Sequence, residues 1–274
     1  MKLLTNCLIC GSNVSNLVQL NVGHDQYLRL LGIDSLTQIR SWIKCLNCGL
    51  MRQSNILDES ETNLLYQLFR SESIRQETPD SYFDRITKMP VEMSENNKRC
   101  AWMNGSIPKS GSILDIGCGG GVFLNEFKRF FGLGWDIAGI EPTPEYASLA
   151  SRRLGVNIET GMFNERSFSG QLFDLITINH VLEHISNPLE FLKNAFALLK
   201  PDGAIYLKTP DQSDFGFLPT NHDRFSLQHI WYFRLIDLEK IGLAAGLVPA
   251  KSEAFISIRG RNNNALLLRR QSDK

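Results

Sequence analysis

The sequence lacks any long run of apolar residues and any excess of charge of one sign. No stretch approaches the ~20 apolar residues that a membrane-spanning helix needs, so we expect no such helix. The chain of 274 residues carries 29 basic and 29 acidic side chains, which gives no global attraction to nucleic acid or to an anionic membrane. The brief apolar stretch near the N-terminus is interrupted by Thr5 and Asn6, so we expect no secretory signal and a cytoplasmic protein.

Cysteine is sparse, with six residues, and in a reducing compartment these are not expected to form disulfides. Four of them form two Cys-x-x-Cys-Gly knuckles, at residues 7–11 and 45–49. Two such pairs can supply four thiolates in a tetrahedron, which is the closed geometry of a structural zinc site. We therefore expect a zinc-binding module over residues 1–57, with the metal held by Cys7, Cys10, Cys45 and Cys48. The alternative is that these cysteines are small buried residues without a metal.

After a helical linker over residues 58–108, apolar runs and amphipathic segments alternate through residues 109–274. Such alternation predicts an α/β domain whose parallel sheet is built with crossover helices. Helices are expected from Pro188, which Asn187 can cap, and over 235–245. A C-terminal hairpin is expected over 254–270, with its turn at Gly260–Asn264. Strands are expected at 112–117, 135–141, 156–159, 173–179 and 203–208, and between the two knuckles around Ile33, Leu36, Ile39, Trp42 and Ile43.

The most informative stretch is Ser112–Gly121, where a short apolar run enters a glycine cluster and an amphipathic segment follows. A strand, a tight loop and a helix in this order can bring backbone N–H groups close to a nucleotide. A dinucleotide fingerprint beginning at Gly117 requires glycine at position 122, but Val122 stands there. The stretch instead has the pattern Asp-x-Gly-x-Gly-x-Gly from Asp115 to Gly121.

This pattern resembles the first motif of class I methyltransferases that use S-adenosylmethionine (SAM). The resemblance implies a Rossmann-like sheet of seven strands with helices on both faces and SAM as the cofactor. It also implies that the loop residues Asp115, Gly117, Cys118, Gly119 and Gly121 line the cofactor site.

Two further strand ends add to this expected cofactor site. Glu141, followed by Pro142, lies at the end of the second expected strand, where an acid can accept both hydroxyls of a ribose. The alternative is an ordinary surface glutamate. In the resembled family the loop after the third strand borders the adenine, which here places Met162 and Phe163 beside it. These two residues can equally be plain core residues.

A buried strand then ends in a polar cluster, Asn179-His180-Val-Leu-Glu183-His184. The segment resembles the HVLEH stretch of the ubiquinone-biosynthesis-like branch of class I methyltransferases. That resemblance places Asn179 and His180 near the methionine part of SAM, with Glu183 and His184 at the start of the next connection. His184 is therefore assigned to the acceptor side, and His180 is either a general base or a structural hydrogen-bonding residue.

The stretch at about 211–233 combines histidines, an arginine and several aromatic residues after the fifth expected strand, as a substrate-recognition loop requires. It resembles the substrate segment of zinc-knuckle sugar C-methyltransferases of deoxysugar pathways, whose large C-terminal domain has no counterpart in these 274 residues. Where that family has Glu-His, this chain has Gln-His, and glutamine cannot act as a base. The expected substrate residues, with two tyrosines that can instead pack between domains, are Tyr66, Tyr82, His184, His222, Arg224, Gln228 and Trp231.

Together these features predict a SAM-dependent methyltransferase acting on a small polar acceptor, with a hydroxyl or carbon of a sugar or nucleotide-sugar in polysaccharide or natural-product biosynthesis favoured. His229 is the first candidate for the base that takes the acceptor proton, and His180 is the second. One alternative is an RNA methyltransferase whose zinc module grips nucleic acid, but residues 1–60 carry only five basic against four acidic side chains. The other alternative is an inactive SAM-binding protein. The sequence gives no prediction of the oligomeric state.

Overall fold

The computed structural model describes residues 2–21, 27–28, 31–32, 40–68, 75–213, 215, 218, 222 and 225–271. Seven strands form a mixed sheet in the order β12-β13-β10-β9-β6-β7-β8. The strands from β10 to β8 pair in parallel, and β13 runs antiparallel to both β10 and β12. The bounds are β6 Gly111–Ile116, β7 Trp135–Glu141, β8 Ile158–Thr160, β9 Phe173–Asn179, β10 Leu199–Pro210, β12 Leu247–Ile256 and β13 Asn262–Arg270.

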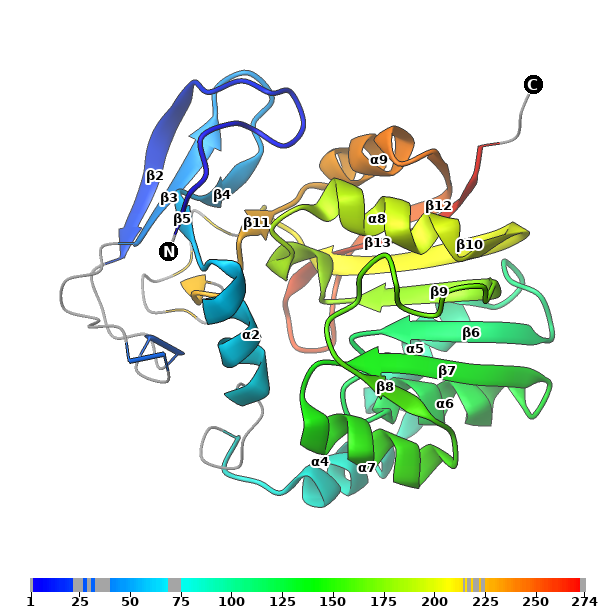
Figure 1. The fold of residues 1–274 in the computed structure, drawn as a ribbon. Coiled ribbons are helices and arrows are strands. Elements are labelled where there is room, and N and C mark those ends of the chain that lie inside the picture. Colours follow the sequence, from blue (N-terminus) through cyan, green and yellow to red (C-terminus); the bar gives the residue numbers. More distant parts are fainter. Residues whose placement is uncertain are drawn as a thin grey trace.

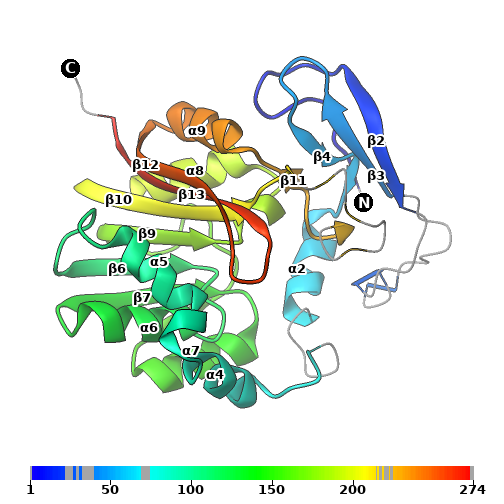
Figure 2. The same ribbon diagram turned by 180° about the vertical axis from the view of Figure 1, so that it is seen from behind.

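Helices cover both faces of this sheet, as Figures 1 and 2 show from opposite sides. On one face, α8 (Pro188–Ala197) and α9 (Leu235–Ala244) pack against alternate residues of β6, β9 and β10. On the other, α5 (Glu95–Met103), α6 (Val122–Phe131) and α7 (Pro144–Leu154) bury the intervening residues. The seven-stranded Rossmann-like fold expected from the sequence is thus confirmed.

Local sequence signals account for where these elements begin and end. Asn187 caps α8 by accepting the backbone N–H of Glu190, and Pro188 occupies the first helical position. The third strand begins at Ile158, two residues later than expected. The expected hairpin turn was placed too late, because β13 already begins at Asn262 and the turn occupies residues 257–261. Asn264 is tolerated in the strand because its buried side-chain amide donates to the carbonyl of Phe233.

A smaller sheet of four strands, in the order β11-β4-β3-β2, lies beside the carboxyl ends of the parallel strands (Figure 1). Its first three strands in chain order are β2 (Ser15–Asn21), β3 (Arg40–Cys45) and β4 (Met51–Gln53). Of the strands expected between the knuckles, β3 contains the positions of Trp42 and Ile43, whereas Ile33, Leu36 and Ile39 lie outside the described residues. A separate pair is formed by β1 (Lys2–Leu3) and β5 (Asn55–Ile56).

The fourth strand of the smaller sheet, β11 (Trp231–Tyr232), comes from the far end of the expected substrate loop. The side chains of Phe225 and Tyr232 pack with Trp42 in one apolar cluster. The far end of the expected substrate loop therefore forms one strand of the N-terminal sheet.

The expected linker contains α2 (Glu59–Leu68) and α4 (Pro79–Thr87) before α5 begins at Glu95. Thr78 caps α4 by accepting the backbone N–H of Ser81. Among the described residues, no helix has the length and apolar character that crossing a bilayer requires.

Candidate active site

A cavity of about 970 Å³ lies beyond the carboxyl ends of the parallel strands. The large sheet supplies its floor, and α2, α4 and the smaller sheet contribute to its other walls. Open α/β sheets bind their ligands at this edge. The expected residues that line the cavity are Tyr66, Tyr82, Asp115, Gly117, Cys118, Gly119, Glu141, Pro142, Met162, Phe163, Asn179, His180, His184, His222, Gln228 and His229.

The glycine loop and the end of β7 form one connected structure. The backbone N–H of Gly119 donates to Oε2 of Glu141 at 2.8 Å, and that of Thr143 donates to Oε1 at 3.0 Å. Glu141 is 2% exposed, so its carboxylate is held by backbone donors at the cavity floor. Gly117 has φ +75°, and a Cβ there would lie 2.6 Å from Cγ2 of Val181. Only glycine fits this turn without movement of its neighbour.

Asp115 lies at the end of β6, where it is 4% exposed. Burial raises the pKa of its carboxyl group to about 7, while a hydrogen bond from the Thr177 hydroxyl at 2.6 Å and the nearby Arg99 guanidinium act in the opposite direction. Arg99 projects from α5 and lies over the Phe123 ring, with its guanidinium carbon 4.5 Å from the ring centroid. A buried acid and a buried cation thus both line the cavity.

The end of β9 carries an unusual backbone conformation. His180 has φ +53°, a left-handed value that non-glycine residues rarely adopt, and its N–H donates to the carbonyl of Lys208. Its Nδ1 lies 3.2 Å from Oε1 of the buried Glu183. Beside it, Oδ1 of Asn179 is buried and has no hydrogen-bond partner among the described residues. Such positions concentrate at functional sites, where the surrounding structure enforces the strain.

Three of the side chains that line the cavity meet one another. The ligand atoms of Glu183, His184 and His229 all lie within 4.8 Å of one another, an arrangement that can share a proton or hold a cation. His184 directs Nδ1 at the carbonyl of Gln228 at 2.8 Å, and a carbonyl can only accept, so Nδ1 carries the hydrogen and Nε2 keeps its lone pair. Burial lowers the pKa of His184 to about 4, which keeps its ring neutral.

The tyrosines and the residues after β8 each line the cavity while also packing against neighbours. Tyr66 makes an edge contact with the His184 ring, at 6.3 Å between centroids, and its carbonyl accepts the hydroxyl of Thr143. Tyr82 lies against Tyr146 of α7. Phe163 packs on Phe191 and also lines the cavity.

Two expected site residues lie elsewhere. Trp231 is 3% exposed in the large apolar core, its indole N–H donates to the carbonyl of Ile185, and it does not line the cavity. The strand β11 turns this ring toward the sheet because alternate residues of a strand face opposite sides. Gly121 is also absent from the lining; it begins α6 at φ +78°, with Ala150 and Leu154 of α7 close by. Arg224 lies outside the described residues.

Sequence reasoning missed three buried cations in the lining, Arg40, Arg99 and Lys208. Lys208 lies 3.5 Å from Glu95, and burial lowers its pKa to about 8. A lysine inside the apolar run of β10 was a usable signal, because a charged residue rarely occupies a buried strand without a partner. Arg99 gave no comparable signal, since an arginine in a polar helix is ordinary.

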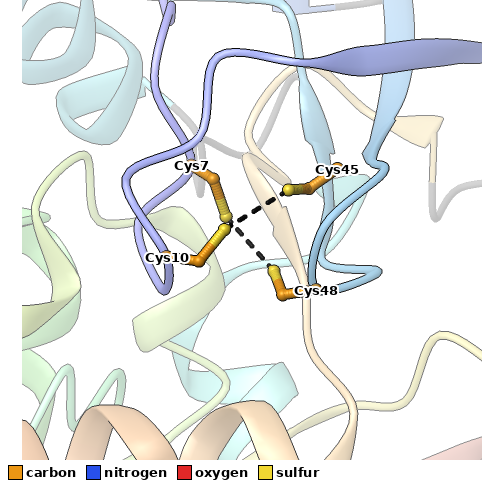
Figure 3. Close-up of side chains that lie close together, drawn as sticks. All are labelled: Cys7, Cys10, Cys45 and Cys48. Carbon is orange, nitrogen blue, oxygen red and sulfur yellow. Dashed lines mark hydrogen bonds between the residues drawn. The ribbon is translucent and has the colours of Figure 1, made fainter.

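The four knuckle cysteines converge, as Figure 3 shows. Cys7 and Cys48 have their sulfur atoms 3.4 Å apart, and those of Cys10 and Cys45 are 3.5 Å apart. All four sulfur atoms lie within 4.8 Å of one another, which matches the donor set of a tetrahedral thiolate site. None of the four forms a disulfide.

The geometry agrees with comparisons to known proteins. The family model described as "Methyltransferase domain" matches residues 85–251, which is more than half of the chain. The chain belongs to the SAM-dependent methyltransferase family. A curated relative, a ubiquinone biosynthesis O-methyltransferase of Actinobacillus pleuropneumoniae, is 33% identical over 107 residues, covering 35% of this chain and 44% of the relative. This methyltransferase thus spans less than half the length of that relative.

Two solved structures share the methyltransferase fold. A SAM-dependent methyltransferase from Aquifex aeolicus has a TM-score of 0.51 at 17% identity, over 70% of this chain and 98% of the other. The Burkholderia thailandensis 1,6-didemethyltoxoflavin-N1-methyltransferase, with bound S-adenosylhomocysteine, has a TM-score of 0.57 at 18% identity, over 83% of this chain and 98% of the other. At these identities the likeness shows the fold.

Proposed function

We propose that this methyltransferase transfers the methyl group of SAM to a small polar acceptor, a sugar or nucleotide-sugar, with His229 as the base and a zinc ion in the cysteine cluster. The observation that carries the proposal is that two sets of polar groups line the same cavity. Glu141 and the glycine loop lie on the floor, and the cluster Glu183–His184–His229 faces the acceptor side. Methyl transfer requires a cofactor site and an acceptor site that meet in this way.

The floor residues fit SAM by their chemistry. Glu141 offers a buried carboxylate to the ribose hydroxyls. The buried, unpartnered Oδ1 of Asn179 and the carboxyl group of Asp115 suit the ammonium group, and Arg99 suits the carboxylate. When bound, SAM supplies an electrophilic methyl group and its own leaving group. The protein must therefore mainly orient the acceptor and remove its proton.

His229 would take that proton from an acceptor hydroxyl. His229 and the neutral His184 lie with ring centroids 4.9 Å apart, and the Glu183 carboxylate beside them stabilises a positive charge as it forms. His180, the second candidate, is turned toward the same carboxylate. Gln228 cannot act as a base, so His229 must remove the acceptor proton without a second base next to it in the chain. A hydroxyl group suits this arrangement better than a carbon acid does.

The deciding experiment is single-turnover methyl transfer by His229→Asn, with a panel of nucleotide-sugars and glycans as acceptors. The expected result is a rate about 10²–10⁴-fold lower, with SAM affinity unchanged. An unimpaired rate would remove His229 from the mechanism. If the wild-type protein binds SAM but methylates no member of the panel, the sugar proposal fails and the inactive alternative gains support.

The RNA alternative is disfavoured by two basic residues of the module, Arg40 and Arg52, whereas Lys2 and Lys44 are exposed. Arg40 donates to the carbonyl of Phe225 and Arg52 to that of Leu4, and both are 4% exposed. Guanidinium groups that are buried and bonded to carbonyls do not contribute to an exposed basic surface for phosphates. Salt-dependent retention of RNA by the full chain would revive this alternative.

A further inference from the structure

The last residue of β4, Gln53, makes an unusual set of contacts with the acceptor side of the cavity. Its side chain is 1% exposed. The amide nitrogen Nε2 lies 3.0, 3.1 and 2.7 Å from the carbonyl oxygens of Ser226, Leu227 and His229. Three carbonyls around one nitrogen can be satisfied only by a donor, which fixes the orientation of the amide.

These contacts hold the backbone segment that carries His229. The backbone N–H of Gln53 donates to the carbonyl of Ile230 as well, at 2.8 Å. Gln53 therefore contacts residues on both sides of His229 and on both sides of Gln228. The carbonyl of Gln228 accepts the Nδ1–H of His184. Gln53 therefore also fixes the position of this carbonyl.

The same strand connects Gln53 to the cysteine cluster. The knuckle 45–48 leads directly into β4, and the N–H of Cys45 donates to the carbonyl of Leu50. Arg52, the neighbour of Gln53, donates to the carbonyls of Leu4 and Thr5, just before the first knuckle. Both knuckles are thus tied to β4 within a few residues of Gln53.

We propose that Gln53 is a positioning residue that places His229 and the Gln228 carbonyl, and that the cysteine cluster controls the acceptor wall through it. The N-terminal module is then a support for the acceptor site. This inference rests on the proposed function only for what His229 does, and the placement itself can be tested without an acceptor.

The test compares Gln53→Met, which keeps the length of the side chain but removes both donors, with the wild-type full chain. Hydrogen exchange measures the backbone of residues 226–232, and nitrogen-labelled histidine spectra report the Nδ1–H of His184. We expect exchange in 226–232 to rise by more than about tenfold and the Nδ1–H signal to be lost. SAM affinity should stay within about twofold, because the floor of the cavity is not in contact with Gln53.

Ser41→Ala is the matched control. Ser41 lies in β3 of the same sheet, where its hydroxyl bonds that of Ser54. It should leave the exchange of 226–232 and the His184 signal as in the wild type. A Cys10→Ser variant with its metal removed should reproduce the changes of Gln53→Met, since the cluster is proposed to act through this residue.

Wild-type exchange and an intact His184 signal in Gln53→Met would overturn the proposal, as would equal changes in Ser41→Ala. If Gln53→Met loses the folded smaller sheet, as shown by rapid amide exchange of β3 and β4, Gln53→Glu is compared above and below the pKa of the new carboxyl. The protonated acid regains one donor, so protection of 226–232 must return at low pH, and its failure to do so overturns the proposal. Gln53→Met can change the exchange of 226–232 and the His184 signal as expected while His229→Asn retains full methyl transfer. In that case the assignment of His229 as the base fails, and the positioning role of Gln53 stands.

Discussion

The backbone N–H of Gly119 donates a hydrogen bond to Oε2 of Glu141, which joins the loop after β6 to the end of β7. The two residues lie 22 positions apart in the chain, yet the pairing of β6 with β7 brings their strand ends together. The Glu141 carboxylate is therefore held by backbone donors that follow both strands.

Glu141→Ala is expected to weaken SAM binding by about 10–100-fold, because hydrogen bonds to a charged group contribute about 1.5–3 kcal/mol. Titration calorimetry with SAM measures the effect. The control is Glu145→Ala, an exposed acid in the first turn of α7. Equal affinities of the two variants would show that Glu141 does not hold the ribose.

The affinity for SAM should depend on pH through Asp115. Burial raises its pKa to about 7, so the carboxyl group takes up a proton and loses its charge as the pH falls through that value. A positively charged ligand group should then bind less well, and SAM affinity should fall from about pH 8 to about pH 6. Calorimetry across this range tests the slope, and Asp115→Asn should flatten it.

The same carboxyl group predicts a dependence of stability on pH. Because the folded pKa of Asp115 lies above its unfolded value of 3.8, the fold binds this proton more tightly than the unfolded chain does. The stabilising contribution is complete below pH 3.8 and is lost as the pH rises through about 7. Urea unfolding of wild type and Asp115→Asn should therefore show the variant gaining relative stability with rising pH. A pH-independent difference would contradict the assignment.

Gly117→Ala should destabilise the loop through two effects, its left-handed backbone and the 2.6 Å approach of the new Cβ to Val181. We expect a loss of about 2–4 kcal/mol in the free energy of unfolding. Gly155→Ala separates the two effects, because Gly155 has φ +71° and nothing within 4 Å of its would-be Cβ. If both variants lose the same stability, the contact with Val181 has no part in the effect.

The cysteine cluster should hold about one zinc ion per chain, as measured by elemental mass spectrometry. Cys10→Ser should lower the metal content and the melting temperature, because a metal tying two knuckles stabilises so small a sheet. Cys118→Ser, which lies outside the cluster, should keep the metal. Protein without bound metal that melts at the same temperature before and after zinc is added would exclude the zinc proposal.

Much of the fold was predictable because its signals are local. The apolar run before Asp115 and the glycines after it require a strand followed by a tight turn. The cap at Asn187 sets the start of α8. The hairpin turn was misplaced because asparagines usually mark turns, and nothing local shows that the side chain of Asn264 has a buried acceptor at Phe233.

The sequence by itself determined the SAM-type glycine loop, the acid at the end of β7 and the two Cys-x-x-Cys knuckles. Each of these features depends on residue type and short spacing. Only the tertiary structure decided which residues line the cavity around His184 and His229. In the folded chain, the Trp231 ring lies in the core and Arg99 and Lys208 line the cavity. The side chain of Gln53 bonds the backbone of residues 226–229. Those contacts join segments more than 170 residues apart, and no local pattern encodes which distant backbone a buried amide will meet.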